Sequence, residues 1–248
     1  MTTASLHAGE LTRSPVPLAS AVLRSRAGRL LDVMVMIWIF CGSLVLVEPS
    51  PYELMFLLVL PLAFMAGMGI YRSTFGLFAI FVAFIPFALI ACFQVRFHTI
   101  PESMVFSAVT IFLLLTAYFL ANYVAEATEH RLRLIMKAYT VTAIICALIG
   151  TLAYLGLMPE ADIFVLYGRA KSTFKDPNVF GPFLILPAMF ALQRILLGRG
   201  RTQLWAGLVY MILFVGVFAS FSRAAWGHFA FSSLIVLLLC FWLEAAAR

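Results

Sequence analysis

The sequence predicts an all-α membrane protein, a bundle of about eight transmembrane helices. Of its 248 residues, 64% are hydrophobic and only 11% are charged, and a soluble domain of this length needs far more charged surface. The apolar residues also gather in segments near the length of about 20 residues that a helix needs to cross hydrocarbon. The net charge of +6 reflects where the arginines lie, and we do not interpret it as a sign of nucleic-acid binding.

The apolar segments follow one another along the whole chain after a polar start. They are predicted at about 30–47, 53–70, 75–93, 104–124, 138–158, 179–197, 204–221 and 227–243. Residues 1–29 are expected to form a cytoplasmic N-terminal tail, and residues 30–248 a transmembrane helical domain. No small-residue cleavage site closes the first apolar segment, so a cleaved signal peptide is not expected. Short joints make consecutive helices antiparallel, and the longest joint is the loop 159–178.

The distribution of lysine and arginine predicts that the N-terminus is cytoplasmic. With that orientation, twelve of the 17 basic residues lie in inner segments, in agreement with the positive-inside rule. The five in outer segments are Arg96, Arg169, Lys171, Lys175 and Arg223. Three of these share the loop 159–178, and positive charge retained against the topological bias indicates a function for this loop.

The end of the loop 159–178 carries a helix start signal. Asp176 is a suitable N-cap residue, and Pro177 is favoured as the first residue of a helix. The positive end of the helix dipole would then face the loop. Basic side chains beside free helix N–H groups form an anion site, most naturally for phosphate. These side chains are Arg169, Lys171 and Lys175.

Arg223 is predicted at the outer joint between the seventh and eighth segments. An arginine at this depth is costly unless it is paired or bound to an anion, and its planar guanidinium can bond two oxygens of a pyrophosphate. The alternative is that Arg223 reaches lipid phosphates or pairs with Asp176. For Arg169 the alternative partners are Glu160 and Asp162.

Two short polar motifs therefore stand at the outer ends of apolar segments. They consist of Arg169 with Ser172-Thr173-Phe174 and Asp176-Pro177-Asn178-Val179-Phe180-Gly181, and then Ser222-Arg223-Ala224. This pattern resembles the O-antigen ligase/polymerase family of bacterial inner-membrane glycosyltransferases, which includes exopolysaccharide polymerases. Members have a periplasmic arginine ahead of T-F-x-[DN]-P-N-x-x-G, and S-R-[GA] in a later periplasmic turn. The resemblance covers roughly residues 169–226 with specific residues, and the rest by hydropathy alone.

The resemblance implies a multi-pass protein of the inner membrane that transfers a glycan from undecaprenyl pyrophosphate. The acceptor would be a hydroxyl of lipid A core or of a growing glycan, at the periplasmic face. Arg169 and Arg223 would act as catalytic residues that hold the pyrophosphate and stabilise its charge as it leaves. The substrate-binding residues would be Lys171, Lys175, Asp176 and Asn178. The donor is already activated, so no cofactor or metal is expected, and the sequence has no P-loop, HExxH or Cys/His cluster.

The chain also departs from the family pattern. Members are longer and carry a further periplasmic loop with a histidine proposed as the general base, so the resemblance implies the N-terminal part of such an enzyme. We therefore expect this chain to bind polyprenyl pyrophosphate weakly without catalysing transfer. His98 and His228 are the alternative bases near the outer surface. Two other hypotheses stay open: a transporter or flippase for an anionic lipid or solute, and a non-catalytic membrane scaffold.

Polar residues and prolines inside the apolar segments predict local features of the bundle. Asn122 is expected to hydrogen-bond between helices. Pro61, Pro86, Pro182 and Pro187 are expected to kink their segments, which opens space for a polyprenyl tail.

Overall fold

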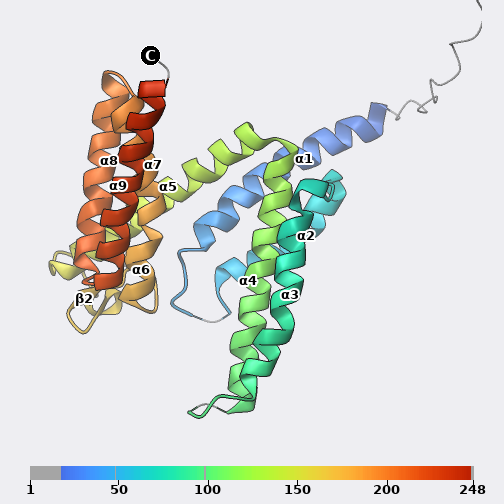
Figure 1. The fold of residues 1–248 in the computed structure, drawn as a ribbon, viewed down its shortest axis with the longest axis horizontal. Coiled ribbons are helices and arrows are strands. Elements are labelled where there is room, and N and C mark those ends of the chain that lie inside the picture. Colours follow the sequence, from blue (N-terminus) through green and yellow to red (C-terminus); the bar gives the residue numbers. More distant parts are fainter. Residues whose placement is uncertain (1–17, 48, 98, 247–248) are drawn as a thin grey trace, which may run out of the picture.

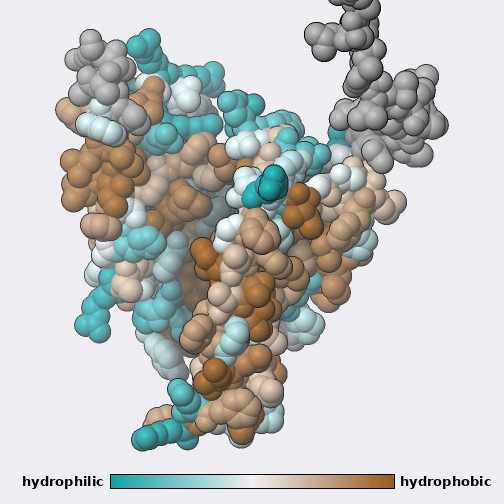
Figure 2. Space-filling view, turned by 45° about the vertical axis from the view of Figure 1, so that its right-hand side comes forward, coloured by the Kyte–Doolittle hydropathy of each residue, from teal (hydrophilic) through white to brown (hydrophobic). Residues whose placement is uncertain are grey.

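The computed structural model describes residues 18–47, 49–97 and 99–246, and most of them are helical (Figure 1). Within these residues, six helices are long and apolar enough to cross a membrane. The prediction of an all-α, polytopic helix bundle is therefore confirmed, and the chain is a multi-pass membrane protein. In Figure 2, apolar side chains cover much of the surface between polar ends.

The helices are α1 (Leu18–Cys41), α2 (Pro51–Ala66), α3 (Phe75–Cys92), α4 (Ile100–Glu126), α5 (Thr128–Tyr154), α6 (Pro177–Phe183), α7 (Ile185–Leu197), α8 (Arg201–Ala219) and α9 (Arg223–Ala246). A 3-10 turn, η1 (Arg72–Thr74), precedes α3. Between α5 and α6 lie a second 3-10 turn, η2 (Ala161–Phe164), and a hairpin of β1 (Val165–Leu166) and β2 (Arg169–Ala170).

The first two predicted segments differ from the helices that the structure has. Helix α1 begins at Leu18, inside the predicted N-terminal tail, and ends at Cys41 instead of continuing to 47. Its apolar part starts only at Leu30, and it is not among the six candidate spans of the described residues. Helix α2 has 16 residues: Ser50 and Glu53 form a capping box at its start, and Gly67 ends it with a φ of 77°. These caps make α2 shorter than the predicted segment 53–70.

The sixth predicted segment is interrupted, as the prolines in it indicated. The structure divides it into α6 and α7 at Leu184. Pro187 has no N–H, so the carbonyl of Phe183 loses its partner within the helix. The hydroxyl of Tyr139 on α5 donates to that carbonyl at 2.7 Å. An orphaned carbonyl in hydrocarbon costs several kcal/mol, on the order of a lost strong hydrogen bond, so Tyr139 makes the break tolerable.

The helices form two groups, seen side by side in Figure 1, with α5 running at an angle between them. One buried core lies among α5 to α9 and the loop before α6. A second lies among α1, α2 and α4, where Trp38 stacks on Tyr52 with ring centroids 4.9 Å apart. Close helix approach uses glycine: a Cβ on Gly216 would lie 2.7 Å from Leu184 Cδ1 and 2.9 Å from Ala147 Cβ. Small residues permit such contacts between membrane helices.

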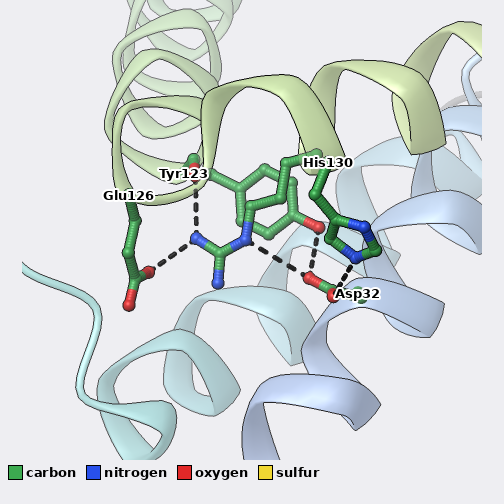
Figure 3. A network of polar contacts seen from close by, with 5 residues as sticks. Asp32, Tyr123, Glu126 and His130 are labelled. Atoms are coloured by element: carbon green, nitrogen blue, oxygen red, sulfur yellow. Dashed lines mark hydrogen bonds and ion pairs between the residues drawn. The ribbon is translucent and has the colours of Figure 1, made fainter.

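A polar network joins α1 to α4 and α5 (Figure 3). Arg131 is only 7% exposed and donates from Nη1 to the Tyr123 carbonyl at 2.7 Å and to Glu126 Oε2 at 2.6 Å. Its Nε lies 3.4 Å from Asp32 Oδ1, which also accepts a 2.6 Å bond from the Tyr123 hydroxyl. His130 Nε2 lies 3.4 Å from Asp32 Oδ2. Since each charge has a partner of opposite sign, we interpret this network as a tether between the two groups of helices.

Asn122 makes the predicted contacts between helices. Its Oδ1 accepts from the backbone N–H of Tyr71 at 2.9 Å and from the Thr74 hydroxyl at 3.0 Å, and its Nδ2 donates to the Tyr118 carbonyl at 2.9 Å. One buried side chain on α4 therefore fixes the joint between α2 and α3.

Replacement of Tyr139 by phenylalanine should destabilise the protein by about 1–3 kcal/mol, because the Phe183 carbonyl then has no donor. The measurement is thermal unfolding of the purified protein in detergent. Tyr210→Phe is the matched control, since no hydrogen bond of the Tyr210 hydroxyl is found among the described residues. In a Pro187→Ala background, the restored N–H should shrink the effect of Tyr139→Phe; an undiminished effect would contradict this account.

Candidate functional site

The loop between α5 and α6 is built around a short β-hairpin, in which each strand has two residues. Val165 pairs with Ala170 and Leu166 with Arg169 in antiparallel register. The tip residues, Tyr167 and Gly168, have φ values of 51° and 70°, which is the left-handed geometry of a tight hairpin turn. The hairpin therefore holds Arg169 at a defined position on the second strand.

The residues after the hairpin are anchored to the bundle. Ser172 is buried with a left-handed φ of 52°, and its hydroxyl donates to the Cys146 carbonyl on α5 at 2.8 Å. The Thr173 carbonyl accepts from the backbone N–H of Val45, in the α1–α2 joint, at 3.0 Å. Phe174 is buried, with its ring centroid 4.9 Å from that of Phe183. The Ser-Thr-Phe part of the first motif therefore positions the loop.

The predicted start of α6 is confirmed. Asp176 Oδ1 accepts from the backbone N–H of Asn178 at 2.6 Å, and Pro177 is the first helical residue. Helix α6 has only seven residues before the break at Leu184, so its dipole is that of a short helix rather than of a full span. Positive charge at this end of the bundle must therefore come mainly from side chains.

Arg169 connects the first motif to the turn that carries the second motif. Its Nε donates to the backbone carbonyl of Ser220 at 3.0 Å, and its Nη2 donates to Asn178 Oδ1 at 2.9 Å. Ser220 lies in the α8–α9 turn, three positions before Arg223. Neither Glu160 nor Asp162, the alternative partners, pairs with Arg169 in the described part of the chain. Its remaining amino group, Nη1, has no partner among the described residues.

A glycine brings α6 against the α8–α9 turn. A Cβ on Gly181 would lie 2.7 Å from Ser220 Oγ and 2.8 Å from Ala225 Cβ, closer than side chains approach without displacement. The turn itself is stabilised locally, because Ser222 Oγ accepts from the backbone N–H of Ala225 at 3.3 Å. The last residue of the first motif thus packs on the two residues, Ser220 and Ala225, that flank the second motif.

Arg223 is the exposed basic residue of this turn. It is the first residue of α9, and no hydrogen bond or ion pair of its side chain is found in the part of the chain that the structure describes. The alternative partner, Asp176, caps α6 instead. At about 100° per residue, Arg223 and Ala225 lie about 200° apart around α9. Arg223 therefore projects away from the contact with Gly181.

The other predicted residues lie around this centre with different exposure. Lys171 is half-buried and Lys175 is exposed. His228 is exposed on α9, about 140° around the helix from Arg223, so the two do not share a face. His98 lies outside the described residues.

An apolar groove lies beside the same turn, between the ends of α5 and α8 and the start of α9. It encloses about 270 Å³. Its wall includes Phe218 and Trp226, whose rings stack 5.0 Å apart, and Phe221, whose φ is 47°. Thr151 also lines it, and the Thr151 hydroxyl oxygen is buried without a hydrogen-bond partner among the described residues. The site thus combines exposed positive charge with an adjoining apolar groove.

Sequence reasoning missed Ser220 as a member of the site. Ser220 contributes its backbone carbonyl, which any residue can supply, so the residue type gives little signal. The groove was also missed, because its wall comes from three helices that are separated in the sequence.

Comparisons with protein-family models, with curated proteins and with solved structures find no match to this chain. The functional argument therefore depends on the residues and geometry described above.

Replacement of Gly181 by alanine should destabilise the contact between α6 and the α8–α9 turn, since the new methyl group would meet Ser220 and Ala225. Overpacking of this kind costs about 1–3 kcal/mol. Gly227→Ala on α9 is the matched control, because a Cβ there meets nothing within 4 Å, and alanine should gain about 0.5–1 kcal/mol in a helix. Thermal unfolding checks both, and equal behaviour of the two variants would contradict the close approach.

Proposed function

We propose that this chain carries the donor-binding site of a membrane glycosyltransferase of the O-antigen ligase or polysaccharide polymerase type. Its donor would be a glycan linked to undecaprenyl pyrophosphate, and its acceptor a hydroxyl of lipid A core or of a growing glycan. The observation that carries the proposal is the link from Arg169 to Asn178 and Ser220, which ties the first motif to the turn that carries the second. Arg169 and Ser220 are 51 positions apart in the sequence and meet at one end of the bundle. A site built from both motifs requires such a contact.

The chemistry of the site suits a pyrophosphate leaving group. The acceptor oxygen attacks the anomeric carbon of the donor, and the bond from that carbon to the pyrophosphate oxygen breaks. The pyrophosphate leaves with the electron pair, and the acceptor proton ends on the pyrophosphate or in water. Arg223 and Nη1 of Arg169 supply positive charge for the oxygens that gain charge in this step. Asn178 and Asp176 position the loop, while Lys171 and Lys175 add positive charge around it.

The apolar groove beside Arg223 suits the other part of the donor. An isoprenoid chain is hydrocarbon, and the groove of Phe218, Phe221 and Trp226 offers an aromatic and aliphatic wall next to the charged turn. If the pyrophosphate of the donor binds at Arg223, the isoprenoid chain attached to it lies at the same depth in the membrane as the groove. This pairing of charge and apolar surface favours a lipid-linked anion over a small soluble one.

The proposed location is the bacterial inner membrane, with the N-terminus in the cytoplasm and the site facing the periplasm. The charge distribution supports this orientation. In Figure 1, β2 and the start of α6 lie at one end of the helices, and the C-terminal end of the chain lies at the other.

The orientation predicts which side a membrane-impermeant thiol reagent can label. In intact spheroplasts, cysteines introduced by Lys171→Cys and Ala224→Cys should react, whereas one introduced by Arg199→Cys should react only after the membrane is opened. The four native cysteines are buried, so their own reaction with the reagent should be weak. Labelling of the Arg199→Cys variant alone in intact spheroplasts would mean that the orientation is inverted.

Binding of undecaprenyl pyrophosphate should depend on Arg223. Arg223→Ala should weaken binding by about tenfold or more, since a hydrogen bond to a charged group contributes about 1.5–3 kcal/mol. Arg223→Lys should recover only part of it, because a point charge loses the two-oxygen geometry. Arg201→Ala, at the opposite end of α8, is the control for charge.

The assay is reconstitution in liposomes with donor and acceptor, with binding and glycan transfer measured on the same samples. Full binding by Arg223→Ala would contradict the proposed role of Arg223. Donor transport across the bilayer, without transfer and with Arg223-dependent binding, would instead favour a flippase.

A further inference from the structure

A second cavity lies at the opposite end of the helices from the candidate site. It encloses about 440 Å³ between the start of α5, the end of α7 and the start of α8, within the range of about 300–1,000 Å³ typical of small-molecule sites. Helix α8 separates the two ends, since its 19 residues span about 27 Å at 1.5 Å per residue. This cavity therefore belongs to neither motif and has no part in the proposed transfer.

The rim of this cavity is basic. Among the residues that the structure describes, Arg133, Lys137 and Arg194 line it and no acidic residue does. All three side chains are exposed. Arg194 is held over the ring of Phe190, with its guanidinium carbon 4.5 Å from the ring centroid. The nearby acid is Glu129, which lies 3.8 Å from Arg133 on the same helix but is itself 89% exposed, so this ion pair is weak.

The deeper wall of the cavity is apolar. Val141 lies two turns beyond Arg133 on α5, and Ala206 and Val209 lie one to two turns beyond Thr202 on α8. Trp205, which is 57% exposed, stands at the rim, a position typical of the membrane–water interface. The cavity thus has a cationic mouth above a hydrocarbon-like interior.

A neighbouring cavity of about 450 Å³ shares two residues with the first, Arg133 and Phe190. It lies between α5, α7 and α9, and its other lining is almost wholly apolar, including Leu186, Val236 and Leu239. Arg133 therefore stands at the rim of two apolar cavities. A ligand with one anionic group and two hydrocarbon chains matches this arrangement.

We propose that the basic cavity binds an anionic phospholipid from the membrane leaflet at that end. The phosphate lies between Arg133, Lys137 and Arg194, and the acyl chains lie along the two apolar cavities. Charge complementarity selects an anionic lipid over a zwitterionic one, because three cations face the ligand and no carboxylate of the described residues lines the mouth. The apolar interior selects a lipid over free phosphate. This inference does not depend on the proposed transferase function.

The test is a titration of the purified full chain in detergent with phosphatidylglycerol, phosphatidylcholine or inorganic phosphate. Native mass spectrometry gives the affinity, and the melting temperature reports the stabilisation of the folded state. Phosphatidylglycerol should bind and raise the melting temperature, whereas the other two should not. The variant with Arg133→Gln, Lys137→Gln and Arg194→Gln should bind roughly 100-fold more weakly, at about fivefold per charge.

The matched control replaces three exposed arginines of the other helix group, with Arg26→Gln, Arg29→Gln and Arg72→Gln. It removes the same charge and should keep phosphatidylglycerol affinity within about twofold, since none of these three residues lines either cavity. The melting temperatures without lipid show that both variants fold. The proposal is wrong if the control loses as much affinity as the cavity variant. Equal binding of phosphatidylcholine, or equal stabilisation by inorganic phosphate, would also overturn it.

Discussion

The candidate site depends on one guanidinium group. Arg169 reaches the carbonyl of Ser220 and the side chain of Asn178, so it fixes the β-hairpin, α6 and the α8–α9 turn relative to one another. Hydrogen bonds of a charged donor are stronger than neutral ones, and two of them from one planar group also fix orientation. The placement of Arg223 and of the apolar groove follows, because both belong to the turn that Arg169 holds.

The same structure shows how a membrane bundle accommodates polar backbone without water. The break between α6 and α7 frees the Phe183 carbonyl, and Tyr139 satisfies it. The joint before α3 is held by Asn122, and the α4–α5 connection is held by the network around Arg131. Each of these three irregular segments is bonded by a side chain from a helix beside it. At the α6–α7 break, which lies within an apolar segment, the absence of water in hydrocarbon requires such a bond.

Much of this arrangement was predictable from the sequence, and the physical reasons differ by element. The apolar segments predict the later helices well, because length and hydropathy alone set a membrane span. The start of α6 followed from Asp176 and Pro177, since capping is local. The early end of α1 at Cys41 was not predictable from hydropathy, which stays high beyond that residue. The contact between Arg169 and Ser220 was not predictable either, because it uses a backbone carbonyl of a distant segment.

The distance in sequence between Arg169 and Ser220 has a consequence for biogenesis. A chain made from its N-terminus presents the hairpin and α6 to the membrane well before α8 and α9 emerge. Until α8 and α9 enter, the guanidinium of Arg169 has only Asn178 as a partner, and Gly181 lacks its contacts with Ser220 and Ala225. The α6 side of the candidate site is therefore made first, and the contact that holds the α8–α9 turn against it forms only later in insertion.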